Sequence, residues 1–134
     1  MKKFFVVLIM VLAGLSAKGQ AQLSYDGYYH TVDSLSPYRY YLRFYPDGSV
    51  IGVNTAGKPE NLLPWFKKEN KTPYKGTYTF SDGKISFKMI SEGGEVHYEG
   101  SLVTDNRLLL VVTSMINNFT GNEEYFFLKI ANLK

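Results

Sequence analysis

The amino-acid sequence predicts an all-β fold, an eight-stranded antiparallel up-and-down barrel, with a β-sandwich as the alternative. Turn signals recur at short intervals, as in Pro46-Asp47-Gly48 and Ser81-Asp82-Gly83, where proline and glycine suit the turn positions. Between the turns, apolar and polar residues alternate, as in Lys84–Ile90, which indicates strands with one buried face. Because an open meander leaves two exposed sheet edges, closure into a barrel is favoured.

Eight segments carry this strand pattern. In chain order they are Tyr25–Val32, Tyr38–Tyr45, Ser49–Asn54, Lys75–Phe80, Lys84–Ile90, Glu95–Val103, Arg107–Met115 and Glu124–Ile130. Thr120-Gly121-Asn122 is expected to form the last hairpin loop. Arg107–Met115 is apolar at consecutive positions, so we expect it to be covered on both faces or to form a contact surface.

The one long break between strands is Thr55–Pro73, which contains the apolar run Leu62–Phe66 and the only tryptophan, Trp65. Pro64 argues against a long helix in this segment. Long loops in compact domains often bind or cover ligands. Three roles are open for the run: a plug for one end of the barrel, a lid at a ligand-binding mouth, or an exposed contact patch.

Residues 1–21 have the features of a secretory signal sequence. Two lysines precede the apolar run Phe4–Leu12, which is too short to span a bilayer as a helix. Small residues permit cleavage after Gly19 or Ala21. We therefore expect one domain, residues 22–134, exported to the periplasm or outside the cell of a bacterium, with no stable membrane span after cleavage.

Charge and cysteine content limit the function classes. The 15 basic and 12 acidic residues include three lysines in the expected signal, so the remainder has 12 of each and is near neutral. A basic surface for nucleic acid or an anionic membrane is therefore not expected. The absence of cysteine argues against a lipid-anchored exported protein, disulfides, thiolate metal sites and thiol catalysis.

Catalytic signals are weak. The two histidines, His30 and His97, lie on strands far apart in sequence, with no carboxylate at a metal-ligand spacing. No nucleophile elbow, P-loop, zinc spacing or EF-hand loop occurs. We expect no enzymatic activity, no cofactor and no metal. An enzyme would need one of the histidines beside a carboxylate in a pocket.

The second expected strand has two faces of different chemistry. The more apolar face carries Tyr40, Leu42 and Phe44. The opposite face carries Arg39, Tyr41 and Arg43. Because an unpaired buried arginine is costly, we predict that the apolar face points inward and the arginine face is solvated. The alternative is that Arg39, Tyr41 and Arg43 point inward and bind a carboxylate.

The segments Asp26–Tyr29 and Tyr38–Val50 (DGYY and YRYYLRFYPDGSV) resemble the start of the C-terminal domain in one family of eukaryotic F-box adaptor proteins. In that family a DGxY strand precedes a YYRYxRFxPDGxV hairpin. Pro59–Pro64, Gly76–Tyr78 and Thr120–Gly121 are similar to its later segments. The resemblance implies a lipocalin-like barrel with a binding or recognition role. The F-box itself is absent, and an exported chain cannot serve an intracellular ubiquitin ligase.

We expect a non-enzymatic exported barrel that binds a small, largely apolar ligand in or at its mouth. The residues expected at the ligand are Tyr40, Leu42, Phe44, Leu62, Trp65, Phe66, Tyr78, Phe87 and Tyr98. The alternative is a filled barrel that acts as an interaction module or inhibitor and binds an envelope protein through Leu62–Phe66. Aromatic rings can fill an eight-stranded barrel, so the presence of a cavity decides between the two.

Overall fold

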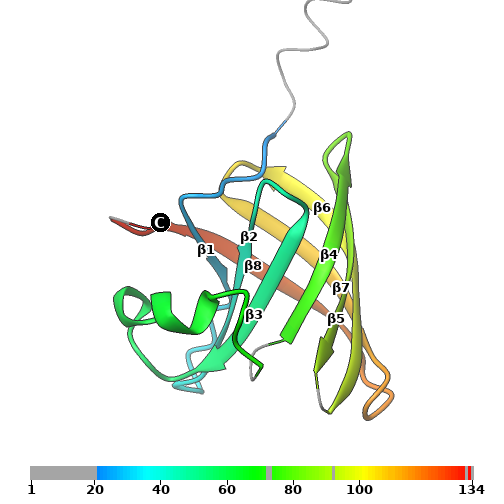
Figure 1. Ribbon diagram of the computed structural model, residues 1–134. Coiled ribbons are helices and arrows are strands. Elements are labelled where there is room, and N and C mark those ends of the chain that lie inside the picture. Colours follow the sequence, from blue (N-terminus) through cyan, green and yellow to red (C-terminus); the bar gives the residue numbers. More distant parts are fainter. Residues whose placement is uncertain (1–20, 72–73, 92, 132, 134) are drawn as a thin grey trace, which may run out of the picture.

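The computed structural model describes residues 21–71, 74–91, 93–131 and 133, which form one closed antiparallel barrel in the order β1 to β8 (Figure 1). The strands are β1 (Gly27–His30), β2 (Arg39–Phe44), β3 (Ser49–Thr55), β4 (Tyr74–Ser81), β5 (Lys84–Ser91), β6 (Gly94–Thr104), β7 (Arg107–Ser114) and β8 (Thr120–Lys129). The predicted eight-stranded up-and-down barrel is confirmed. The expected signal sequence lies outside the described residues, apart from Ala21.

The start of β8 differs from the prediction. Thr120–Asn122 belongs to the strand, so the hairpin loop predicted there is wrong, and the turn lies in residues 115–119. Asn118 provides the left-handed backbone, with a φ of 59°. The glycine at position 121 is explained by close packing and not by a turn, because a Cβ at this position would lie 2.7 Å from the ring of Phe119.

β1 closes the barrel over only part of β8. Gly27 lies opposite Lys129 and His30 lies opposite Phe126, which leaves residues 120–125 of β8 paired with β7 alone in the described part of the chain. The β1–β2 loop, residues 31–38, lies beside this stretch of β8, and a cavity separates the two. The barrel wall is therefore incomplete at this end.

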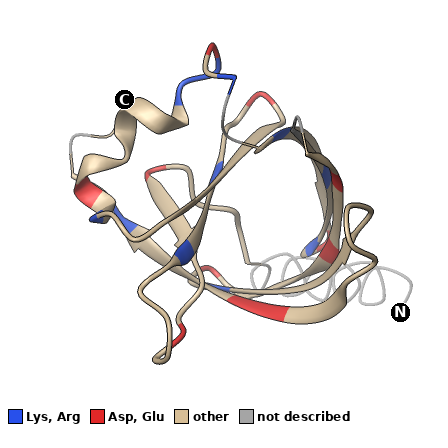
Figure 2. Ribbon diagram, turned by 90° about the horizontal axis from the view of Figure 1, so that it is seen from below, with Lys and Arg blue, Asp and Glu red and all other residues tan. Residues whose placement is uncertain are grey.

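The two ends of the barrel differ. The closed end carries the β2–β3, β4–β5 and β6–β7 turns, and the N-terminal segment crosses it (Figure 1). There Leu23 is buried, the Gln22 amide donates to Asp105 Oδ1 (2.9 Å), and the Ser24 amide donates to the Tyr29 hydroxyl (3.1 Å). The open end carries the other four connections, and Figure 2 looks towards it.

Aromatic rings fill the interior towards the closed end. Phe44, 1% exposed, lies at the centre of a group of edge-on rings. Its ring centroid is 5.6 Å from that of Tyr29, 5.2 Å from Tyr78 and 5.5 Å from Phe87. Such edge-to-face contacts add to the hydrophobic gain of burial. Leu42 and Phe44 point inward, as predicted for this face of β2.

The β3–β4 connection packs against the outside of the barrel. It contains two 3₁₀ helices, η2 (Pro59–Asn61) and η3 (Leu63–Phe66), beside β3 (Figure 1). No helix in the described part of the chain has the length and apolar character to cross a membrane. Leu62 and Phe66 of the connection form a second buried cluster with three outward-facing residues of the wall, which are Tyr28, Tyr41 and Ile51.

This outer cluster corrects two predictions. The arginine face of β2 is not solvated, because Tyr41 and Arg43 are 2% and 7% exposed beneath the connection. Arg43 lies 4.7 Å from the Tyr45 ring centroid, a cation–π contact that helps to accommodate a buried guanidinium. The run Leu62–Phe66 is not a plug, since Phe66 stacks on the outward-facing Tyr28 with ring centroids 4.4 Å apart.

Candidate functional site

A cavity of about 420 Å³ occupies the open end of the barrel. It is lined by inward-facing residues of five strands and by the β7–β8 loop: Tyr40, Tyr74, Val96, Tyr98, Val112, Ser114, Ile116, Asn117, Phe119 and Glu123. The strand register explains the grouping, because Tyr98 lies opposite Val112, and Val112 lies opposite Gly121. Gly121 contributes no side chain, which leaves this side of the wall to the Phe119 ring.

Glu123 is the only charged residue among the described residues that line this cavity. It belongs to β8, where Leu110 is its cross-strand neighbour and Tyr125 follows on the same face. The Tyr125 hydroxyl donates a hydrogen bond of 2.7 Å to Glu123 Oε1. A half-buried carboxylate with a phenol donor is tolerated at a barrel mouth, whereas an isolated one in the filled half would be costly.

Glu123 is surrounded by neutral phenols. Burial raises the pKa of Tyr98 well above its ordinary value, and the charge of Glu123 adds to the shift. Burial and then Glu123 also raise the pKa of Tyr40 and of Tyr125. These phenols are therefore protonated at neutral pH and act as hydrogen-bond donors.

Tyr98 is a buried polar residue of the cavity. Its side chain is 7% exposed, and its ring stacks on Phe87 at 4.6 Å and 9°. Its hydroxyl makes no hydrogen bond with the described residues. The hydroxyl oxygen is not fully enclosed by the protein, and Tyr98 lines the cavity. This donor is therefore available to a molecule in the cavity.

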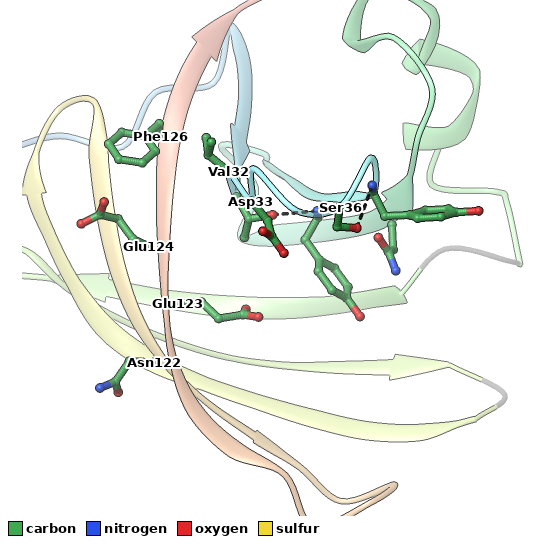
Figure 3. Close-up of a pocket in the computed structure, with 11 residues that line it drawn as sticks. Val32, Asp33, Ser36, Asn122, Glu123, Glu124 and Phe126 are labelled. Carbon is green, nitrogen blue, oxygen red and sulfur yellow. Dashed lines mark hydrogen bonds between the residues drawn. The ribbon is translucent and has the colours of Figure 1, made fainter.

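A second cavity of about 540 Å³ lies at the incomplete part of the wall, between the β1–β2 loop and β8 (Figure 3). It shares Tyr40 and Glu123 with the first, so the two meet at these side chains. Figure 3 shows Glu123 on one side of β8 and Glu124 on the other. Glu124 is paired on the outer face with Arg107, whose Nε lies 2.9 Å from Glu124 Oε2.

The β1–β2 loop is held by its own polar side chains. The Tyr40 amide donates to Thr31 Oγ1 (3.0 Å), and the Leu35 amide donates to Asp33 Oδ1 (2.9 Å). The Tyr38 amide donates to Ser36 Oγ (3.2 Å). These contacts fix the loop that borders the second cavity, as expected of turn-forming Asp, Ser and Thr side chains.

The residues predicted at the ligand separate into three groups. Tyr40 and Tyr98 line the open-end cavity, whereas Leu42, Phe44, Tyr78 and Phe87 lie in the interior packing. Leu62, Phe66 and Tyr41 belong to the outer cluster, and the buried Arg43 lies beside it. Two residues belong to none of these groups: Arg39 is half-buried and Trp65 is 50% exposed. The cavity residues that sequence reasoning missed are Tyr74, Val96, Val112, Ser114, Ile116, Asn117, Phe119 and Glu123.

A sequence signal for Glu123 existed. The period of two places Glu123, Tyr125 and Phe127 on one face, and the latter two are apolar enough to mark it as the inner face. The signal was lost because the strand was expected to start at Glu124.

Neither histidine lies in this site. His97 is near Glu95, with 3.1 Å between Nε2 and Oε2, but both side chains are about 40% exposed on the outer face of β6. The His30 ring nitrogen Nδ1 lies 3.0 Å from the Thr31 carbonyl oxygen. The described residues include no group of three His, Cys, Asp or Glu side chains that could hold a metal ion.

No family model matches the chain, and no solved structure matches it significantly. The resemblance of the Tyr38–Val50 hairpin to the F-box adaptor family stays a prediction, and the site is described by its own geometry.

Proposed function

We propose that this chain is a non-enzymatic barrel that binds one small molecule at its open end. The observation that carries the proposal is the open-end cavity, which is lined by Glu123 and by the buried Tyr98, whose hydroxyl makes no hydrogen bond with the described residues. Its volume, about 420 Å³, falls within the range of roughly 300–1,000 Å³ that is usual for small-molecule sites.

The cavity suits a molecule with an apolar part and a polar part. Val96 and Val112 offer apolar walls, and Phe119 covers the position beside Gly121. Aromatic packing around Phe44 leaves the binding position at the mouth and not deep in the barrel. With the expected export, the role is that of a carrier or sensor in the periplasm or outside the cell.

A second candidate function, a protein-interaction module, is favoured by a different observation. Outward-facing Leu109 and Val111 of β7 are 39% and 47% exposed, and Phe126 of β8 is 36% exposed. Trp65 in the connection is 50% exposed, so the predicted Leu62–Phe66 contact patch is reduced mainly to this residue. Exposed apolar strips of this kind often mark contact surfaces.

Titration with N-phenyl-1-naphthylamine, an uncharged dye that fluoresces in apolar sites, tests the proposed function. The protein would be residues 21–134, which contain all eight strands. We expect saturable one-to-one binding that is weakened at least about tenfold by Val112→Trp, which fills the cavity. Val111→Trp is the matched control, because this neighbour faces outward. Equal binding by both variants, or no saturable binding by the folded protein, contradicts the site.

A further inference from the structure

We propose that the molecule bound in the open-end cavity carries a positively charged amino group whose counter-ion is Glu123. The ligand class is an arylalkyl or alkyl ammonium. This inference rests on the proposed function and specifies its ligand, which the sequence predicted to be largely apolar.

The charges around the two cavities favour a cation. In the described part of the chain, Glu123 is the only charged side chain that lines the open-end cavity. The adjoining cavity is lined by Asp33, Glu123 and Glu124, and neither has a lysine or arginine among its described lining residues. An anion in the open-end cavity would meet the Glu123 carboxylate with no described lysine or arginine in the lining to offset it, which is unfavourable where water is partly excluded.

Glu123 has acceptor capacity left for an ammonium. Oε1 accepts the Tyr125 hydroxyl, whereas Oε2 accepts no hydrogen bond from the described residues. Of the two other carboxylates, Glu124 is paired with Arg107, and Asp33 is exposed in the β1–β2 loop and does not line the open-end cavity. Glu123 is therefore the carboxylate that can take a charge-assisted hydrogen bond inside the cavity.

The tyrosines around Glu123 suit the same ligand. Tyr40, Tyr74 and Tyr98 surround the cavity, and aromatic ring faces attract ammonium groups within about 6 Å. The raised pKa values of Tyr40 and Tyr98 keep their hydroxyls protonated, so these two side chains add no negative charge to the site. The Val96 and Val112 side chains offer an apolar surface to the hydrocarbon part of the molecule.

Calorimetric titration with three probes of similar shape tests the charge preference. The probes are 2-phenylethylammonium, 2-phenylethanol and 3-phenylpropionate, which are a cation, a neutral molecule and an anion. We expect the ammonium to bind at least about tenfold more tightly than the alcohol, the factor typical of a charge-assisted hydrogen bond, and the carboxylate to bind most weakly.

Glu123→Gln isolates the carboxylate. The amide oxygen can still accept the Tyr125 hydroxyl, so the thermal unfolding midpoint is expected to stay within a few degrees of the wild-type value. The preference for the ammonium over the alcohol should fall about tenfold. Glu124→Gln, the adjacent residue on the outer face, is the matched control and should retain the preference.

The outcomes separate the two proposals. If the alcohol or the carboxylate probe binds as tightly as the ammonium, the ligand is not cationic, although the binding function stands. If Glu124→Gln, but not Glu123→Gln, removes the preference, the counter-ion assignment is overturned. If neither these probes nor the uncharged dye binds to folded wild-type protein, the proposed function itself fails, and this inference fails with it.

Discussion

The closed and open ends of the barrel are built from the same eight strands, but their chemistry differs. At the closed end the N-terminal segment crosses the opening, and the Tyr29 and Tyr78 hydroxyls donate to the Asp105 and Tyr45 carbonyls. At the open end the Tyr98 hydroxyl has no partner among the described residues, and Glu123 faces a cavity. We therefore expect the closed end to contribute more to stability, and we place the proposed binding at the open end.

The largest expected effect is on the free energy of unfolding, when one phenylalanine ring is removed from the packed interior or from the open end. Phe44→Ala removes a ring that is 1% exposed within the packed interior, and we expect a loss of about 3–5 kcal/mol in the free energy of unfolding. Phe119→Ala removes a ring that is 52% exposed at the open end, and we expect a loss below about 1 kcal/mol. Urea denaturation measures both. Similar losses for the two variants would contradict the contrast between the ends.

The next largest effect on the free energy of unfolding is expected from replacing one of two closely packed strand glycines by alanine. A Cβ at Gly76 would lie 1.8 Å from the Lys88 carbonyl oxygen, so Gly76→Ala forces the backbone apart and should cost about 3 kcal/mol. A Cβ at Gly121 would meet only the far end of the Phe119 side chain at 2.7 Å, which can move aside. Gly121→Ala should therefore cost much less by the same urea measurement. An equal cost would show that the Phe119 wall is rigid.

Alkaline pH should weaken the protein through its buried and half-buried tyrosines, which include Tyr98 at the open end and Tyr78 at the closed end. Burial raises the pKa of Tyr98 above its ordinary 10.0, so its contribution to stability is complete below pH 10 and is lost as the pH rises further. One such proton changes the free energy of unfolding by at most about 1.4 kcal/mol per pH unit.

Tyr98→Phe should therefore flatten the decline of stability with rising pH in urea denaturation between pH 9 and 11. Tyr29→Phe at the closed end is the comparison, since hydrogen bonding to Ser24 partly offsets the effect of burial on the pKa of Tyr29. A steeper slope for Tyr98→Phe than for the wild type would contradict this assignment.

The smallest effect is expected at the surface of the closed end. Lys68 and then the Ser49 amide hydrogen-bond to Asp47 and lower its pKa to about 2. The stability gained from this carboxylate is present above its ordinary pKa and is lost as the pH falls towards 2. An NMR titration should show Asp47 near pH 2 in the wild type and closer to 3.8 in Lys68→Met. A wild-type value already at 3.8 would show that the contact is not maintained in solution.

Much of the barrel was predictable from local pattern, and the site was not. Alternation in Lys84–Ile90 and the turn residues 46–48 reflect contacts between neighbours in sequence, so the strands and the up-and-down order followed from them. The sequence predicts a turn at Thr120-Gly121-Asn122 because the packing of Gly121 against Phe119 has no local signal. That error moved the start of β8 and concealed the inward position of Glu123.

The outer cluster was beyond sequence reasoning for a different reason. Arg43 and Tyr41 alternate with apolar residues as a solvated face would, and nothing in that alternation reveals that a distant segment covers them. The docking of Leu62 and Phe66 depends on tertiary contacts with Tyr28 and Ile51 from two other strands. A period of two identifies the faces of a strand, but it cannot identify what lies against each face.

The cover on both sides of β2 has a consequence for strand pairing. A slip of one residue exchanges the faces of a strand, which in an ordinary sheet brings polar residues inward and apolar residues into water. In β2 it would place Arg43 among the interior rings and leave Leu42 and Phe44 beneath the connection that now fits Tyr41. Such a slip would disturb the packing of the interior and of the outer cluster at once. The β3–β4 connection therefore adds a second constraint on the register of β2.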